Sequence, residues 1–275
     1  MNPRLLAIIA RMEFTATARL WWIRTFTAAY ALMTVAMAYA SGVIGGTEPG
    51  EGFARLTIAV LPLALMLVPL ASLLIATSGA AGDDTTGFLL AQPVSRLQHL
   101  LGRWLGHAGA ITTSVVAGFG TGGALVSMLS GATDVSRFAV LLAACVLAGL
   151  AFLSVATLIV SGASRRSAAI GVAAFVWFFS VILYDAAMLA VALAVPGTAG
   201  ARVLFISVFG NVVDLVRVLT LLVAGTPHVL GAAGESWLRA LGGPAAASAL
   251  SAAALLAWIV VPLAIAVRIH STRDA

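Results

Sequence analysis

The sequence contains no lysine, and all 15 of its basic residues are arginine. A chain without lysine has no P-loop lysine, no lysine Schiff base and no lysine-dependent acylation site. If transport by this chain is driven by ATP, another chain must therefore bind the nucleotide.

Charged residues of either sign are also scarce. They make up 9% of the 275 residues, whereas 61% are hydrophobic. An ordinary soluble domain is about 25% charged, so too few ionised groups remain to cover a fold of this size in water. Lipid must cover it instead. The single cysteine, Cys145, lies in an apolar run, which excludes a disulfide scaffold and a cysteine-rich metal site.

Long apolar runs account for most of the chain. A helix needs roughly 20 apolar residues to cross a hydrocarbon core of about 30 Å. Six runs are long enough: Thr25 to Ile44, Leu56 to Gly79, Trp104 to Ser130, Phe138 to Gly162, Ala168 to Val195 and Pro244 to Val267. We therefore predict an all-α integral membrane protein with six transmembrane helices, forming a single domain over residues 1–275.

The arginines are unevenly divided between the two sides of the predicted membrane protein. Six crossings place both termini on one side, and that side carries ten of the fifteen arginines. By the positive-inside rule both termini are cytoplasmic. The net charge of +5 then follows from orientation and does not indicate nucleic-acid binding.

The segments outside the crossings suggest further elements. Residues 1–24 carry Leu5, Ile9 and Met12 opposite Arg4 and Arg11, a pattern that predicts an amphipathic helix on the inner leaflet, with an ordinary cytoplasmic extension as the alternative. Two connections are long, the cytoplasmic loop 80–103 and the external segment 196–243. Loops of that length usually have a function.

The external segment contains three polar residues at intervals of three. Asn211, Asp214 and Arg217 therefore share one face of a short helix, which we place in the outer leaflet before the last span. They could form an outer gate or dock a periplasmic partner. The alternative is a surface ion pair between Asp214 and Arg217.

The cytoplasmic loop begins acidic, continues apolar and ends basic after a proline. This order favours a short surface helix that presents one face to a partner. The candidate coupling residues in it are Asp83, Asp84, Gly87, Pro93 and Arg96. Arg165 and Arg166 form the second inner turn, where they could meet an acidic partner surface or only satisfy the orientation rule.

The same order of parts resembles the coupling segment of type-two ABC permeases. Later segments are similar to the permease of the nitrous-oxide-reductase maturation transporter, which assembles a copper-sulfur centre outside the cytoplasmic membrane. The matching segments are Gly102 to His107, Gly118 to Gly120, Ser167 to Gly171, Val176 to Phe178, Asp185, and Asn211 with Asp214 and Arg217. Phe88, Val212 and the arginines that stand for family lysines depart from that pattern.

The resemblance implies a bacterial cytoplasmic-membrane permease that is not an enzyme. Its implied partners are a second copy of itself, two copies of a soluble ABC ATPase that would bind ATP and Mg, a periplasmic repeat protein and membrane lipids. The cargo would be a sulfur species, or the transporter would drive its partner mechanically. No cofactor or metal is expected on this chain. A type-two permease for a lipid, drug or peptide, and a non-transporting scaffold or sensor, are the alternatives.

Asp185 is an acid in the middle of an apolar run. Such a carboxylate costs about 2.5 to 3.5 kcal/mol on insertion scales, so it should face protein, water or a partner. It either lines the translocation path, where we also place Met188, or stays protonated as a hydrogen-bond donor. The structural alternative is that it ties the fifth span to a neighbour through Ser, Thr or Tyr184.

Gly118 to Gly123 match a dinucleotide-binding pattern by letters alone. No strand precedes them, so we interpret Gly118 and Gly122 as a small-residue face for close helix packing, with Gly102 and Gly106 repeating the spacing.

Overall fold

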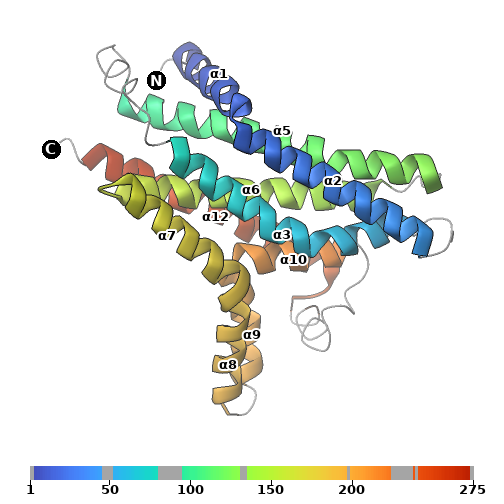
Figure 1. Cartoon of the computed structure of the whole chain (residues 1–275). Helices are drawn as coiled ribbons and strands as arrows, with labels where there is room; N and C mark the ends of the chain where they lie inside the picture. Colours follow the sequence, from blue (N-terminus) through green and yellow to red (C-terminus); the bar gives the residue numbers. More distant parts are fainter. Residues whose placement is uncertain are drawn as a thin grey trace.

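The computed structural model describes residues 3–44, 52–79, 95–130, 135–196, 199–223, 238 and 241–272, and that part of the chain is helical with no strand. Its helices are α1 (Pro3–Arg19), α2 (Trp21–Ile44), α3 (Gly52–Gly79), α5 (Arg96–Ser130), α6 (Ser136–Gly162), α7 (Arg166–Phe178), the π-helical segment η1 (Phe179–Leu183), α8 (Tyr184–Ala194), α9 (Ala199–Gly210), α10 (Val212–Val223) and α12 (Pro244–Thr272) (Figure 1). The predicted all-α membrane class is confirmed.

All six runs predicted as crossings are helical, and five of them are long and apolar enough to span a membrane. These five are α3, α5, α6, the continuous α7–η1–α8 helix, and α12. The predicted first span, α2, is not among them over the described residues. The sixth candidate is instead the pair α9 and α10, which bends by 104° at a short break. A bent pair of this kind is a broken span or a re-entrant loop.

Helix α5, the third of the six predicted spans, begins earlier than predicted. Residues 96–103, which we placed in the cytoplasmic loop, are the first turns of α5. Ser95 and Gln98 form a reciprocal cap: the Gln98 amide donates to the Ser95 hydroxyl at 3.3 Å, and the Ser95 amide donates to the Gln98 side chain at 3.3 Å. This capping box fixes the helix start just after the proline.

Glycines on α5 allow α1 and α2 to pack closely along it, as predicted. A methyl carbon at Gly118 would lie 2.5 Å from Cβ of Tyr30, and one at Gly122 would lie 2.5 Å from Cβ of Thr34 on α2. Gly102 and Gly106 contact α1 in the same way. Close backbone approach is what small residues provide in membrane helices, so α5 supports the two N-terminal helices α1 and α2.

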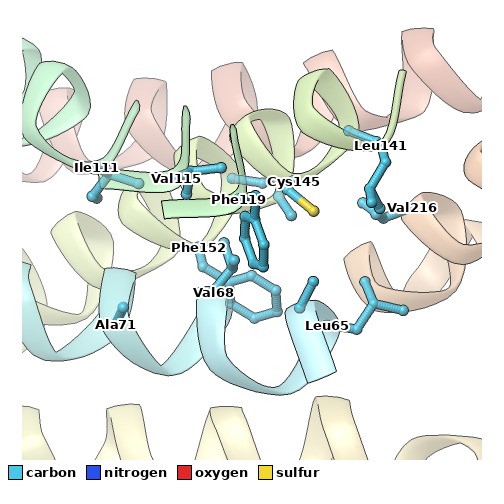
Figure 2. Close-up of a cluster of buried hydrophobic side chains, with 14 of the residues drawn as sticks. Leu65, Val68, Ala71, Ile111, Val115, Phe119, Leu141, Cys145, Phe152 and Val216 are labelled. Atoms are coloured by element: carbon cyan, nitrogen blue, oxygen red, sulfur yellow. The ribbon is translucent and has the colours of Figure 1, made fainter. Parts of the chain in front are cut away.

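The core lies where α3, α5, α6 and α10 meet (Figure 2). Its labelled side chains include Leu65 and Val68 from α3, Val115 and Phe119 from α5, Cys145 and Phe152 from α6, and Val216 from α10. The thiol of Cys145 is buried among these apolar groups. Because α10 contributes to this core, it is a structural part of the bundle.

The external segment 196–243 contains two helices where the sequence predicted one. Helix α9 pairs with α8, and the two project from the bundle (Figure 1). Helix α10 turns back and packs against α12 and α6, with ten of its twelve residues buried. Helix α10 is the predicted short helix with the polar stripe, and α9 is an additional helix that the sequence analysis did not predict.

Candidate functional site

Four of the sequence-predicted residues come together where α8 leaves the bundle. Asp185 is in the first turn of α8, and Asn211, Asp214 and Arg217 lie at and after the bend between α9 and α10. Nη1 of Arg217 donates to Oδ2 of Asp185 at 2.8 Å and to Oδ1 of Asp214 at 2.9 Å. We call these four residues the polar cluster. One guanidinium therefore joins carboxylates from two different helices.

Asn211 organises the bend itself. Its side-chain oxygen accepts from the Val213 amide at 3.1 Å, which caps the start of α10. Its side-chain amide donates to the Ser180 carbonyl at 2.8 Å and approaches Oδ2 of Asp214 at 3.3 Å. Ser180 lies in η1, and such π-helical turns occur frequently at functional sites. Asn211 therefore connects the π-helical segment η1 to the bend between α9 and α10.

Two further side chains hold α9 at the bend. The Tyr184 hydroxyl donates to the Ser207 carbonyl at 2.7 Å, and it also packs closely against Gly210. The indole of Trp258 on α12 donates to the Phe209 carbonyl at 3.0 Å. Carbonyls at the end of a helix lack partners within that helix, so α8 and α12 both stabilise the last turn of α9.

The polar cluster is buried on one side and open on the other. The side chain of Asp214 is 11% exposed, whereas those of Arg217 and Asp185 are 37% and 49% exposed. A buried carboxylate requires a partner, which Arg217 and Asn211 supply. The exposed Asp185 remains accessible to a second subunit, to water or to a passing solute. Within the described residues no group of three His, Cys, Asp or Glu side chains could hold a metal ion.

Both structural alternatives offered by the sequence need correction. The Asp214–Arg217 contact exists, but Asp214 is buried, so it is not a simple surface pair. Asp185 does tie its helix to a neighbour, but through Arg217 and not through Tyr184, whose hydroxyl bonds to Ser207. Met188 is half-buried on the next turn of α8.

Sequence reasoning missed the π-helical turn and the contacts from Tyr184 and Trp258. The sequence carries no periodic signal for a π-turn, because both flanking helices have the same apolar composition. The contact of Trp258 with Phe209 joins residues 49 positions apart, which spacing alone does not predict.

The predicted coupling residues that the structure describes lie away from the polar cluster, at one end of the bundle. The start of α5, the turn between α6 and α7, and the end of α12 lie at one end (Figure 1). Arg96 is the first residue of α5, and Arg165 and Arg166 form the exposed turn before α7. Asp83, Asp84, Gly87 and Pro93 lie outside the described residues.

Comparison with known proteins agrees with this architecture. The family model described as ABC-2 family transporter protein matches residues 7–275. The chain therefore belongs to this family of permease subunits. It is 34% identical over 224 residues to the probable ABC transporter permease protein NosY of Pseudomonas aeruginosa, covering 78% of this chain and 80% of the relative. It is 31% identical over 277 residues to the protein of the same name from Stutzerimonas stutzeri, covering 96% and 97%.

As an ABC-2 permease subunit, the chain is a multi-pass membrane protein and not itself an enzyme. Membership of the family implies partnership with a separate ATPase subunit.

Proposed function

We propose that this chain is the permease of a transporter that serves maturation of nitrous oxide reductase. The observation that carries the proposal is its likeness to two proteins named NosY, one of them over 96% of the chain. The polar cluster supports it, because the Asp, Asn and Arg that contribute to the sequence resemblance also contact one another in space. The transporter would export a sulfur species or drive a periplasmic partner.

The cytoplasmic end would receive motion from the ATPase. Arg96, Arg165 and Arg166 are exposed at one end of the bundle, where they could contact an acidic partner surface. Asp83, Asp84, Gly87 and Pro93 complete the proposed coupling surface on sequence grounds. In this orientation both termini are in the cytoplasm and the α8–α9 hairpin lies toward the periplasm.

A second copy of the chain would complete the translocation path. Within one chain, only 11% of the most apolar part of the α7–η1–α8 helix is buried, against 56% for the span Arg55–Thr77. Phe175 on this span is 62% exposed. Asp185 and Met188 would line the path on the same helix, and the polar cluster would act as an outer gate or dock a periplasmic protein.

Co-purification from membranes tests the coupling. A soluble ATPase should travel with the chain in equal number, and Asp83→Arg with Asp84→Arg should remove it while the permease stays folded. Arg202→Glu on α9, at the far end, is the matched charge change and should leave the ATPase bound. Unaltered association in the Asp83/Asp84 variant would count against the coupling assignment. Deleting the gene and measuring the copper-sulfur centre of nitrous oxide reductase tests the maturation role.

A further inference from the structure

A cavity of about 230 Å³ opens between α3, α5, α6 and α12, at the end of the bundle that holds the α6–α7 turn. Of the described residues that line it, five are arginine or histidine and none is Asp or Glu: Arg96, His99, Arg103 and His107 come from α5, and His270 comes from α12. A concave site lined by several positive or hydrogen-bond-donating groups suits an anion.

Two other polar residues of the lining form hydrogen bonds within α6. The hydroxyls of Thr157 and Ser161 donate to carbonyls of their own helix, each at 2.8 Å. Glu13 of α1 lies behind the lining, 3.7 Å from Arg103 and 3.8 Å from His107. Because Glu13 is not among the lining residues, it contacts Arg103 and His107 from outside the cavity.

A second cavity continues from the first between α5 and α12. It has a volume of about 190 Å³, shares Arg96 and His270 with the first, and adds Leu97, Val267 and Ser271. The first cavity also has apolar walls, from Ala76, Leu100 and Val160. Basic and apolar side chains therefore line both cavities, and this combination matches an amphiphile better than a small soluble anion.

We propose that the two cavities bind one anionic phospholipid. The phosphate headgroup is held by Arg96 and His270, with the α5 histidines around it, and an acyl chain lies along Leu97 and Val267. Arginine binds phosphate through a planar set of donors, and basic pockets between membrane helices bind anionic headgroups. The site bridges α5 and α12, so the lipid would join the two helices next to the proposed coupling surface. The proposal does not rest on the cargo or on nitrous oxide reductase.

Native mass spectrometry of the full chain, incubated with equal amounts of phosphatidylglycerol and phosphatidylcholine, tests the site. The wild-type chain should retain phosphatidylglycerol preferentially. Arg96→Gln with His270→Gln removes one formal positive charge and one imidazole donor, and should lower that retention by about fivefold or more. The matched control, Arg165→Gln with Arg166→Gln, removes two charges at the same end but outside the cavity, and should retain the lipid.

Val267→Phe provides a second variant that leaves every charge in place. The larger side chain fills the second cavity and should also lower retention of phosphatidylglycerol. Size-exclusion chromatography should still show a monodisperse chain. Equal retention of both lipids, or unchanged retention in both cavity variants, would overturn the proposal. Stabilisation by inorganic phosphate without retention of phosphatidylglycerol would assign the cavity to a free anion and overturn the lipid. Loss of the ATPase in the Arg96/His270 variant with unchanged lipid would assign it to a protein partner.

Discussion

Arg217 on α10 donates to Asp185 on α8 at 2.8 Å, and this contact joins two helices that are 32 positions apart in the chain. The same nitrogen contacts the buried Asp214 at 2.9 Å. Arg217 therefore donates to two carboxylates at the point where α8 leaves the bundle. Movement of α8 relative to α10 would have to break or rearrange this contact, which supports the proposed role of the polar cluster as an outer gate or a docking site.

Arg217→Gln should destabilise the chain more than Asp185→Asn. The arginine variant leaves the buried Asp214 without its half-exposed cation, a loss of about 1–3 kcal/mol for a buried group that loses its partner. Asp185→Asn removes only a half-exposed partner and keeps Arg217 paired with Asp214, so about 1 kcal/mol is expected. Thermal unfolding in detergent measures both.

A double variant provides the control for that comparison. Asp214→Asn combined with Arg217→Gln removes a carboxylate along with the cation, and should recover part of the stability lost in Arg217→Gln alone. Equal losses for Arg217→Gln and Asp185→Asn would show that Asp214 does not depend on the arginine.

Substitutions at Asn211 should separate its two contacts. Asn211→Ser keeps an oxygen that can cap α10 but cannot reach the Ser180 carbonyl, whereas Asn211→Leu loses both interactions. We expect a loss of about 1 kcal/mol from the hydrogen bond and about 1 kcal/mol more from the cap. Hydrogen exchange of residues 207–214 should be faster in the Ser variant and fastest in the Leu variant. Identical exchange in both would remove one of the two contacts from the account.

The glycine face of α5 gives a prediction with a control on the same helix. Gly122→Ala would place a methyl group 2.5 Å from Thr34, whereas nothing lies within 4 Å of the position at Gly120. Overpacking should cost about 1–3 kcal/mol at Gly122. Gly120→Ala should be neutral or slightly stabilising, because alanine favours helix more than glycine does. Equal melting temperatures for the two variants would contradict close packing of α2 on α5.

Charge reversal at the α6–α7 turn should weaken ATPase binding. Arg165→Glu with Arg166→Glu places two acids where an acidic partner surface is proposed, and like charges across an interface oppose association. Less ATPase should co-purify, and the difference should shrink at high salt because exposed charges are screened. Arg202→Glu on α9 is the control. Full retention of the ATPase would leave these arginines as orientation signals only.

The sequence predicted the helical membrane class and most of the long helices, because hydropathy over a bilayer-length window is a strong signal. It also identified Asp185, Asn211, Asp214 and Arg217 individually, because polar groups stand out in apolar runs. The spacing of three placed the last three on one face, and the structure adds that Asp185 joins them.

The remaining features depended on packing that a periodic pattern does not encode. The packing of α10 into the core is an example. Helix α10 is covered by α6 and α12, and the spacing of Asn211, Asp214 and Arg217 does not show this. The start of α5 could have been found, since Ser95 and Gln98 have the spacing of a capping box.

The most direct test of the proposed function is the state of nitrous oxide reductase in cells that lack this gene. The account predicts that the enzyme accumulates without its copper-sulfur centre and does not reduce nitrous oxide. The wild-type gene should restore both the absorption spectrum of the centre and the activity. A complete centre and normal nitrous oxide reduction in the deleted cells would contradict the maturation role.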